Sequence, residues 1–544
     1  MKYRNFLLKL FINRNGCLSL YPLTIYTLFG ARIIFKICVV LCGFLVGAAI
    51  YYRTTNIWAL KNLADSFLYK QIGLRPIIIG TFNRMKNEQN VDGHFVVMQF
   101  IGDSRMSHSL YCFSNDENGE TSISRAHIQR IHKGKRAATD VCSWSGHIAE
   151  CHVAQAFPKS IRVSTVSNIN HSIEIAVEPP LINERHKLVV CIAPMYTYTD
   201  WQTMLLGIET WLILGATKLI VPIQSATKAV YTILKQYEKA GLVVIRHWPK
   251  LPILSDVNPN GLVLSRGIEE SHVNCLFYVK PWAEMVAFTD IDDLLLPVDP
   301  ATIYQNNAVD LLQNFLIEHP QAGSFLFEHK DVQIVLPEGN NLTTLANFNF
   351  NFLEKTRWKS TCKVWRMKTR VIAIANRVDT VNMHETGIHR FGYVQVHIPC
   401  HKGHFYHMRH SHREIGHESL VSMTFLMNKV NKAFSDRINS ELLEISRIPL
   451  NRSSTESFED FDSCIKEINR EHLTLVVSRC MTPHVCYSRS KNNMACITSA
   501  GYYKFSHSSN DFIIALVRSN FTNSNMDCES SYPQYLQGNY FYLP

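Results

Sequence analysis

Acidic residues are absent from the first 53 positions of this 544-residue chain, which hold seven Lys and Arg. The formal net charge of +10 therefore falls to +3 over the rest of the chain. A basic excess confined to one terminus argues against nucleic acid as a partner. Charged residues are scarce, at 18%, whereas hydrophobic residues make up 46%, which argues against a disordered chain. The length is enough for two or three folded domains.

One stretch near the N-terminus has almost no polar residues. Residues 37–52 are uncharged and mostly apolar, and extension back to Ile33 gives twenty residues, the length that spans a bilayer. Basic residues precede this stretch, which keeps the N-terminus cytoplasmic under the positive-inside rule. We therefore predict a cytoplasmic tail at 1–32 and a single-pass type II transmembrane helix at 33–52. A cleaved signal peptide and a merely buried helix are the alternatives.

Everything after the predicted anchor would lie in the secretory lumen, and two features fit that location. Four Asn residues stand in N-x-S/T sequons, where a lumenal protein is glycosylated: Asn170, Asn341, Asn451 and Asn520. Twelve of the 15 Cys lie beyond the anchor, an even number that suits disulfides. We expect bridges first in the loop-rich C-terminal region, at Cys480, Cys486, Cys496 and Cys528.

The pattern of apolar residues divides the rest of the chain. Residues 53–90 have mixed polarity and are interpreted as a stem. Residues 91–185 contain short apolar runs such as HFVVMQFIG and SIRVSTV between polar, Gly-containing stretches, which indicates a β-rich accessory region. The dipeptide Pro179-Pro180 marks the end of that pattern.

Strands and helices then alternate. Buried strands are predicted at 188–194, 218–223, 242–248 and 285–288, and amphipathic helices at 201–214, 228–240 and 264–278. Such alternation is typical of an α/β fold with a mostly parallel sheet and flanking helices. Ligands bind such a sheet beyond the carboxyl ends of its strands.

The motif that carries chemistry stands at one of these strand ends. The strand in MVAFTDIDDLLLP (Met285–Pro297) is followed by Asp290 and Asp292, with Ile291 between them. On an extended chain residues two apart project the same way, so the two carboxylates are expected to face one divalent cation while Ile291 turns into the core. A cation held there can be shared with a nucleotide diphosphate. D-x-D alone is weak, because most such triplets are solvated loops.

Several separated motifs resemble glycosyltransferase family 92, a family abundant in nematodes. They are CIAPMYTYTDWQTMLLGIETWLILGATKLIVPI, VYTILKQYEKAGLVVIRHWP and NCLFYVKPWAEMVAFTDIDDLLLP. The resemblance runs from about Lys187 to about Arg413. It implies a GT-A-like mixed sheet, which we place at 186–420, followed by a C-terminal Cys-containing region at 421–544.

The resemblance also implies an activity and a location. A hexose, galactose by default, would pass with inversion from a UDP-sugar donor to a glycan or glycoprotein acceptor, assisted by a divalent metal, usually Mn²⁺. The enzyme would be a Golgi membrane protein with its catalytic domain in the lumen. A non-catalytic lumenal protein of the same fold, binding glycans or nucleotide sugars, is the alternative. A phosphohydrolase with D-x-D after a buried strand fits less well, since three strands precede the motif here.

Carried over by position, the family's D-x-D falls on Asp290 and Asp292, and Asp293 stands where the family often has Glu. The family's late His-Tyr-Arg falls on His407, Met408 and Arg409, so the Tyr is replaced. We predict His407 as a third metal ligand and Arg409 as a contact of the diphosphate, because a guanidinium matches phosphate oxygens bidentately.

The remaining site residues are less sharply indicated. An inverting transfer needs a base beside the acceptor oxygen, and Glu385, His384 and Asp379 are the candidates, with His384 also matching an earlier family His. Met195 and Tyr196, in the loop after the first strand, are expected either to contact the nucleotide base or to pack in the core. A zinc site is an alternative for the His-rich stretch, with four candidate ligands: Cys400, His401, His404 and His407.

Overall fold

The computed structural model separates into two compact units, residues 1–72 and 73–544. It describes residues 35–48, 73–84, 93–131, 142–181, 183–254, 257–296, 308–332, 348–359, 369–408, 420–440 and 494–525, with short pieces at 345, 444, 448, 480, 528, 530–531 and 533–537.

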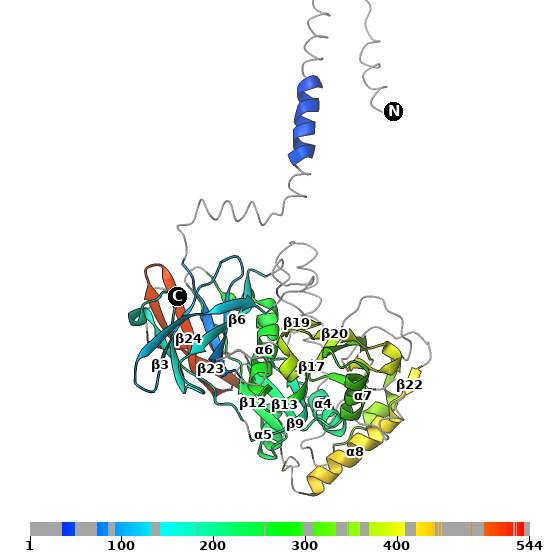
Figure 1. Cartoon of the computed structure of the whole chain (residues 1–544). Helices are drawn as coiled ribbons and strands as arrows, with labels where there is room; N and C mark the ends of the chain where they lie inside the picture. Colours follow the sequence, from blue (N-terminus) through cyan, green and yellow to red (C-terminus); the bar gives the residue numbers. More distant parts are fainter. Residues whose placement is uncertain are drawn as a thin grey trace, which may run out of the picture. The chain divides into compact units, whose positions relative to one another are not determined.

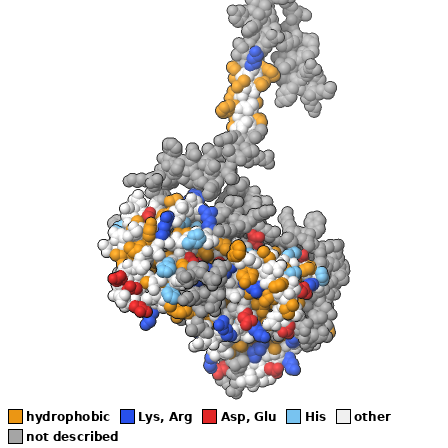
Figure 2. Space-filling model, viewed as in Figure 1, with side chains coloured by type: hydrophobic (Ala, Val, Ile, Leu, Met, Phe, Trp, Pro, Cys, Tyr) orange, Lys and Arg blue, Asp and Glu red, His pale blue; other side chains and the backbone are white. Residues whose placement is uncertain are grey.

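The first unit is described only over residues 35–48, which are helical. Hydrophobic side chains cover the visible face of this helix (Figure 2), and Phe44 is 76% exposed. None of the helices in the described ranges is long and apolar enough to cross a membrane. The ends of the predicted membrane helix, residues 33–34 and 49–52, lie outside the described residues.

The strand-helix alternation predicted after Pro180 is confirmed. Its elements are β9 (His186–Ile192), α4 (Trp201–Ile213), β10 (Lys218–Ile223), α5 (Lys228–Lys239), β12 (Val243–His247), α6 (Ile268–Val279) and β13 (Ala283–Thr289). Asp200 caps α4 by accepting a hydrogen bond from the Thr203 N–H at 3.0 Å. Helix α6 begins four residues later than predicted, because Ser265 and Arg266 have left-handed backbone angles that no helix continues.

These strands form one half of a mixed sheet. Among the described residues its order is β12-β10-β9-β13-β17-β15-β21-β14, with β20 beside β15 (Figure 1). The first four strands are parallel, and β17 reverses the direction by pairing antiparallel with β13. The other strands and helices of this part are β14 (Asp293–Leu296), α7 (Ala308–Glu318), β15 (Ala322–Asp331), β16 (Arg357–Lys359), β17 (Thr369–Ile374), β18 (Val378–Val381), β19 (Thr386–His389), β20 (Val394–His397), β21 (His404–His407), β22 (Leu420–Ser422) and α8 (Thr424–Asn439). The predicted mixed α/β fold is thus confirmed.

Alternate residues of the parallel strands enter two different cores. Leu188 and Val190 of β9 pack in the cluster that includes the apolar faces of α4 and α5. Val189 and Cys191 point to the opposite face, where α6 covers them and Cys275 forms a disulfide with Cys191. Burial on both faces explains why these strands are continuous apolar runs in the sequence.

A second sheet combines strands from both ends of the chain. Its order is β11-β23-β24-β1-β2-β6-β5, with β25 beside β23, and Figure 1 shows the blue and orange-red strands side by side. Its strands are β1 (Ile77–Asn83), β2 (His94–Asp103), β5 (His127–Arg130), β6 (Trp144–Val153), β11 (Ser225–Thr227), β23 (Cys496–Ser508), β24 (Asp511–Ser524) and β25 (Gln534–Gln537). A smaller sheet completes this accessory part, with β3 (Tyr111–Asn115), β4 (Thr121–Arg125), β7 (Ser160–Ser164) and β8 (Ile173–Ala176). Strand β1 falls within the range interpreted as a stem, and β23 and β24 fall within the C-terminal Cys-containing region.

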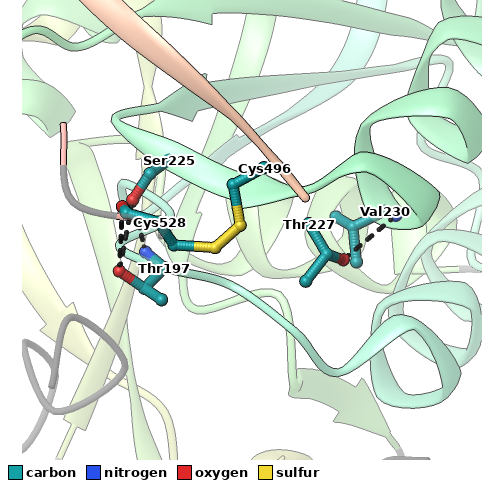
Figure 3. The surroundings of a disulfide bond; sticks show 6 residues. All are labelled: Thr197, Ser225, Thr227, Val230, Cys496 and Cys528. Carbon is teal, nitrogen blue, oxygen red and sulfur yellow. Dashed lines mark hydrogen bonds between the residues drawn. A yellow bond between two sulfur atoms is a disulfide. The ribbon is translucent and has the colours of Figure 1, made fainter. Parts of the chain in front are cut away.

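Strand β11 joins the accessory sheet to the α/β part, because it follows β10 directly and pairs antiparallel with β23. A disulfide between Cys496 and Cys528 lies at this junction (Figure 3). Thr197, in the loop after β9, donates its hydroxyl to the carbonyl of Cys528 at 3.3 Å and its N–H to the Ser225 hydroxyl at 2.7 Å. The C-terminal segment is therefore bonded to loops at the carboxyl edge of the parallel strands.

Disulfides also connect Cys112 to Cys151 and Cys142 to Cys480. The expected bridging of the C-terminal region is confirmed for Cys480, Cys496 and Cys528, and Cys486 lies outside the described residues.

Candidate metal and nucleotide-sugar site

The D-x-D motif forms a turn and not an extension of the strand. Strand β13 ends at Thr289, and the Asp293 N–H donates to the Asp290 carbonyl at 3.1 Å, which closes a turn over Asp290, Ile291 and Asp292. Ile291 is buried, as predicted. Its carbonyl lies against Gly207 of α4, where an added Cβ would come within 1.9 Å of the Ile291 oxygen. Close packing on a helix, and not strand alternation, therefore sets the direction of the two carboxylates.

Strand pairing brings His407 to this turn. Strands β14 and β21 are antiparallel, with Asp293 and His407 as direct partners in the register. Neighbouring side chains on paired strands lie close enough to bond, and the Asp293 Oδ1 atom lies 2.5 Å from the His407 Nδ1 atom. The Met408 N–H, one residue on, donates to the Asp292 carbonyl at 2.8 Å.

Asp293 is completely buried and is the centre of the polar cluster. Its Oδ1 atom accepts from the His329 Nε2 atom at 2.7 Å, and its Oδ2 atom accepts from the Arg370 Nε atom at 2.5 Å. Burial by itself would raise the pKa of Asp293, but the charges of Arg370, His329 and His407 hold the pKa well below its usual value. Burial lowers the pKa of His329 to about 4, so that imidazole is neutral at pH 7 and its Nε2–H donates a hydrogen bond to the carboxylate.

The bond to Asp293 fixes the tautomer of His407. With Nδ1 protonated as the donor, Nε2 keeps its lone pair, and it lies 3.8 Å from the Asp292 Oδ2 atom. A carboxylate that orients a histidine in this way is the usual support of a metal-binding imidazole. Ligand atoms from Asp290, Asp292, Asp293 and His407 all lie within 4.8 Å of one another. Ligands of an octahedral ion at about 2.1 Å are separated by roughly 3 to 4 Å, so the cluster fits a hard divalent cation.

Arg370 of β17 connects two of the carboxylates. Its Nη2 atom donates to the Asp290 Oδ2 atom at 2.6 Å, while Nε donates to Asp293. The guanidinium is buried, and burial alone would lower its pKa, but Asp293 and Asp290 raise the pKa and keep the group charged. Arg370 thus offsets the repulsion between carboxylates that a short turn forces together.

The candidate bases His384 and Glu385 lie in the turn between β18 and β19, beside Arg370. The His384 Nδ1 atom lies 3.1 Å from the Thr369 carbonyl, to which it donates, and 3.4 Å from the Arg370 Nη1 atom. Burial, and then the charge of Arg370, lower the pKa of His384 to about 4. The Glu385 Oε1 atom is buried and has no hydrogen-bond partner among the described residues.

The third candidate base, Asp379, has different partners. Its Oδ1 atom accepts from the Lys280 Nζ atom at 2.7 Å and from the Arg390 Nε atom at 3.0 Å. Two cationic side chains therefore bond the same carboxylate oxygen. His384 therefore contacts Arg370 of the cluster, and Glu385 is its neighbour in the chain, whereas Asp379 lies in a separate ion-pair group.

Met195 and Tyr196 were predicted to contact the nucleotide base or to pack in the core, and Arg409 to contact the diphosphate. Met195 and Tyr196 are both buried in the loop after β9. The Tyr196 hydroxyl donates to the backbone carbonyls of Ser265 and Arg266, at 2.9 and 3.1 Å, so Tyr196 supports the turn before α6. Arg409 lies outside the described residues.

The alternative zinc site is not formed. Cys400 is disulfide-bonded, so no thiolate is available to a metal. His404 directs its Nδ1 atom to the Cys400 carbonyl at 3.2 Å, and His401 is exposed. In the part of the chain that the structure describes, the candidate metal-binding clusters all include Asp293 and His407.

Two residues of the cluster, His329 and Arg370, were not anticipated from the sequence. Arg370 is the one charge in the run TRVIAI, and an ionised residue inside a buried strand requires a buried partner. That signal could have identified Arg370 but not its partners. His329 stands beside Glu328 after the apolar run FLF and gives no comparable signal.

The fold and the cluster define an α/β protein with a candidate divalent-cation site at the carboxyl edge of its sheet. Residues 186–446 match the family model "Glycosyltransferase family 92". This match covers slightly less than half of the chain and confirms the resemblance that the motifs indicated.

Curated relatives carry the same family description. Two Caenorhabditis elegans proteins described as glycosyltransferase family 92 proteins are 24% identical over 249 and 214 residues, which cover 45% and 39% of this chain. A third is 28% identical over 137 residues and 24% of the chain. The matches span 46%, 40% and 26% of these relatives, so this chain aligns with less than half of each.

Among solved structures, Staphylococcus aureus TarS in complex with UDP-GlcNAc aligns with 53% of this chain and 76% of its own, at 10% identity and a TM-score of 0.24. A second TarS structure, of residues 1–349, covers 56% of this chain and 89% of its own, at 12% identity and a TM-score of 0.23. Likeness at this level says nothing about the fold or chemistry of this chain.

Proposed function

We propose that this chain is a glycosyltransferase that moves a hexose, galactose by default, from a UDP-sugar to a glycan or glycoprotein acceptor with inversion. The sheet would serve as a GT-A-like donor-binding sheet. One observation carries the proposal. The ligand atoms of Asp290, Asp292 and His407 converge at the carboxyl end of β13, in a domain of glycosyltransferase family 92.

Asp290, Asp292 and the His407 Nε2 atom would hold the cation, with Mn²⁺ as the expected ion. When bound, it supplies positive charge to the departing diphosphate. Asp293 keeps the His407 imidazole in the tautomer with a free Nε2 lone pair. Arg370 holds the Asp290 carboxylate in place. Arg409 is the proposed additional contact of the diphosphate.

Glu385 is the proposed general base. Its buried Oε1 atom has no hydrogen-bond donor among the described residues, so no group of the described chain uses the lone pairs that a general base needs. His384 is the second choice, because its neutral imidazole donates through Nδ1 and keeps a lone pair on Nε2. Replacement Glu385→Gln is expected to lower kcat by about 10²- to 10⁴-fold with the melting temperature unchanged. Activity that survives in Glu385→Gln but is lost in His384→Gln would transfer the role to His384.

The same proposal places the domain in the Golgi lumen on a type II anchor at residues 33–52. The apolar sequence of that stretch and the disulfides of the folded part support a secretory address. Alkaline carbonate extraction of cell membranes tests it. A chain that stays in the pellet and carries endoglycosidase-sensitive glycans agrees with the proposal, whereas a chain released without glycans contradicts it.

The activity is tested with the full chain and a panel of UDP-sugars, with Mn²⁺ or with a chelator. Release of UDP that requires both Mn²⁺ and a glycan acceptor, and that falls at least 100-fold in Asp292→Asn, would agree with the proposal. Metal-dependent UDP binding without turnover on any acceptor would favour the non-catalytic binding protein. A folded chain that binds no UDP would overturn both.

A further inference from the structure

A cavity of about 420 Å³ lies beside β12, and residues of the accessory sheet form its opposite wall. We call it the β12 cavity. Its volume is within the range of small-ligand sites. Its lining is mixed, because apolar and aromatic side chains such as Trp248 and Tyr503 stand beside three arginines and one glutamate. The charged side chains therefore indicate the class of ligand that the cavity selects.

The single glutamate at the lining is already paired. Arg246 of β12 donates to both carboxylate oxygens of Glu178, at 2.5 and 3.0 Å, and its Nη2 atom also donates to the Asn274 side-chain oxygen at 3.3 Å. This ion pair leaves no net charge in the cavity. The neighbouring imidazole adds none, since burial and then the charge of Arg246 lower the pKa of His247 to about 4 and keep it neutral at pH 7.

The other two arginines, Arg266 and Arg518, have only neutral partners. The Arg266 Nη1 atom donates to the Gln224 Oε1 atom at 3.4 Å. The Arg518 guanidinium stacks on Tyr502, 4.6 Å from the ring centre. Within the described part of the chain neither guanidinium forms an ion pair with a carboxylate. The β12 cavity therefore has an excess of two positive charges at its lining.

A β-bulge in β24 places Arg518 at the cavity. Tyr502 of β23 is opposite Arg518, and the next residue, Tyr503, is opposite Leu516, so Val517 is an extra residue on β24. Alternate residues of a regular strand face opposite sides, yet these three residues of β24 all line the cavity. Bulges re-aim side chains and are frequent next to functional sites. Arg518 is also exposed, so a ligand that enters from solvent can reach it.

The backbone at Arg266 is held in an unfavourable conformation. Its φ of 55° lies in the left-handed region. The Tyr196 hydroxyl and the Trp248 indole N–H both donate to the Arg266 carbonyl, at 3.1 and 3.4 Å, and hold this conformation. A glycine would adopt the same angle without strain, so the arginine is present for its side chain and not for the turn.

From these contacts we infer that the β12 cavity binds an acidic sugar, whose carboxylate or sulfate group bonds the guanidinium groups of Arg266 and Arg518. A guanidinium matches two oxygens of such a group bidentately. A cavity with both aromatic and polar lining suits the rest of a sugar ring. None of Asp290, Asp292 and His407 lines the cavity, so it is a second binding site, separate from the proposed metal site.

The preference for an anion follows from the charges alone. The assignment of a sugar rests on the proposed function, because a glycan acceptor supplies sugar units.

The test uses NMR titrations of the full chain with three matched probes: glucuronate, glucose 6-sulfate and glucose. The wild type is expected to bind at least one acidic sugar about tenfold or more tightly than glucose. The sugar that binds more tightly identifies the group as a carboxylate or a sulfate. Inorganic sulfate that binds as tightly as either acidic sugar would overturn the assignment of a sugar.

Arg518→Gln is the first variant, because Arg518 is exposed and its side chain is not needed for strand pairing. It is expected to bind the acidic sugar about tenfold more weakly and to keep the wild-type affinity for UDP in the presence of Mn²⁺. Arg266→Gln is the second variant and should weaken acidic-sugar binding in the same way. The matched control is Arg125→Gln, an exposed arginine of β4 outside the cavity, which should leave both affinities unchanged.

Unchanged acidic-sugar affinity in both Arg518→Gln and Arg266→Gln would overturn the inference. An equal loss of UDP affinity in Arg518→Gln would also overturn it, because the cavity would then belong to the donor site. A wild-type chain that turns over a UDP-sugar but binds neither acidic sugar would overturn the inference and leave the proposed function in place. A wild-type chain that binds an acidic sugar but does not bind UDP would overturn the proposed function and leave the anion site in place.

Discussion

At the scale of the residue, Asp293 decides the chemistry of the cluster. Its two carboxylate oxygens bond Arg370, His329 and His407, and its side chain is 0% exposed. Because both oxygens of this enclosed carboxylate are hydrogen-bonded, Asp293 orients its three neighbouring side chains and is not itself a proposed metal ligand. The motif D-x-D-D therefore divides into two proposed metal ligands and one residue that supports them.

Asp293→Asn is expected to destabilise the protein by about 3 to 5 kcal/mol, because Arg370 keeps its charge in a buried site and loses a carboxylate partner. Mn²⁺ affinity should fall as well, since an amide orients His407 less strongly. Chemical denaturation and Mn²⁺ titration measure the two effects. The control is Glu444→Gln, which removes an exposed pair with Lys239 and should cost about 0 to 1 kcal/mol. Equal effects of the two substitutions would contradict the supporting role of Asp293.

At the scale of the element, the contact between α4 and the D-x-D turn sets the site. The Trp211 indole of α4 donates to the Asp293 carbonyl at 3.0 Å, and Gly207 lets the Ile291 carbonyl approach the helix. Helix α4 thus fixes the turn from two points one helical turn apart.

Gly207→Ala should stabilise an isolated helix by about 1 kcal/mol, yet here the added Cβ would lie 1.9 Å from a backbone oxygen. We expect the collision to displace the turn, lower the melting temperature and weaken Mn²⁺ binding at least tenfold. Gly261→Ala, where an added Cβ meets nothing within 4 Å, is the control and should change neither the melting temperature nor Mn²⁺ binding. Wild-type Mn²⁺ affinity in Gly207→Ala would show that the turn does not depend on α4.

At the scale of the whole molecule, the accessory sheet is completed by both ends of the chain. Strand β1 pairs with β2 on one side and with β24 on the other, although more than 400 residues separate β1 from β24. Strand β11 then connects this sheet to the α/β part. The family 92 segment, residues 186–446, therefore lacks elements on which its own strand β11 depends.

A chain truncated after residue 446 is expected to be insoluble or to unfold at a much lower temperature than the chain of residues 73–544. Truncation removes β23 and β24, exposes the edges of β1 and β11, and breaks the Cys142–Cys480 disulfide. Solubility, circular dichroism and thermal melting compare the two chains. A truncated chain with a cooperative transition at the same temperature would show that the α/β part folds independently.

Much of the fold and part of the site could be predicted because they depend on local signals. Apolar runs of strand length and amphipathic periodicity identified β9, α4, β10, α5, β12 and β13 in order. Parallel alternation then placed Asp290 and Asp292 at a carboxyl edge. The start of α6 was misplaced, because nothing in the composition of Leu264–Gly267 reveals left-handed backbone angles at Ser265 and Arg266.

The sequence by itself determined the class of fold, the resemblance of residues 186–446 to glycosyltransferase family 92 and the strand end that carries the carboxylates, since each follows from short-range pattern. Only the tertiary structure decided the partners of Asp293. His407 is 114 residues away and Arg370 is 77 residues away, and both reach Asp293 through strand pairing. Register between distant strands is set by packing of the whole sheet, so a linear pattern does not contain it.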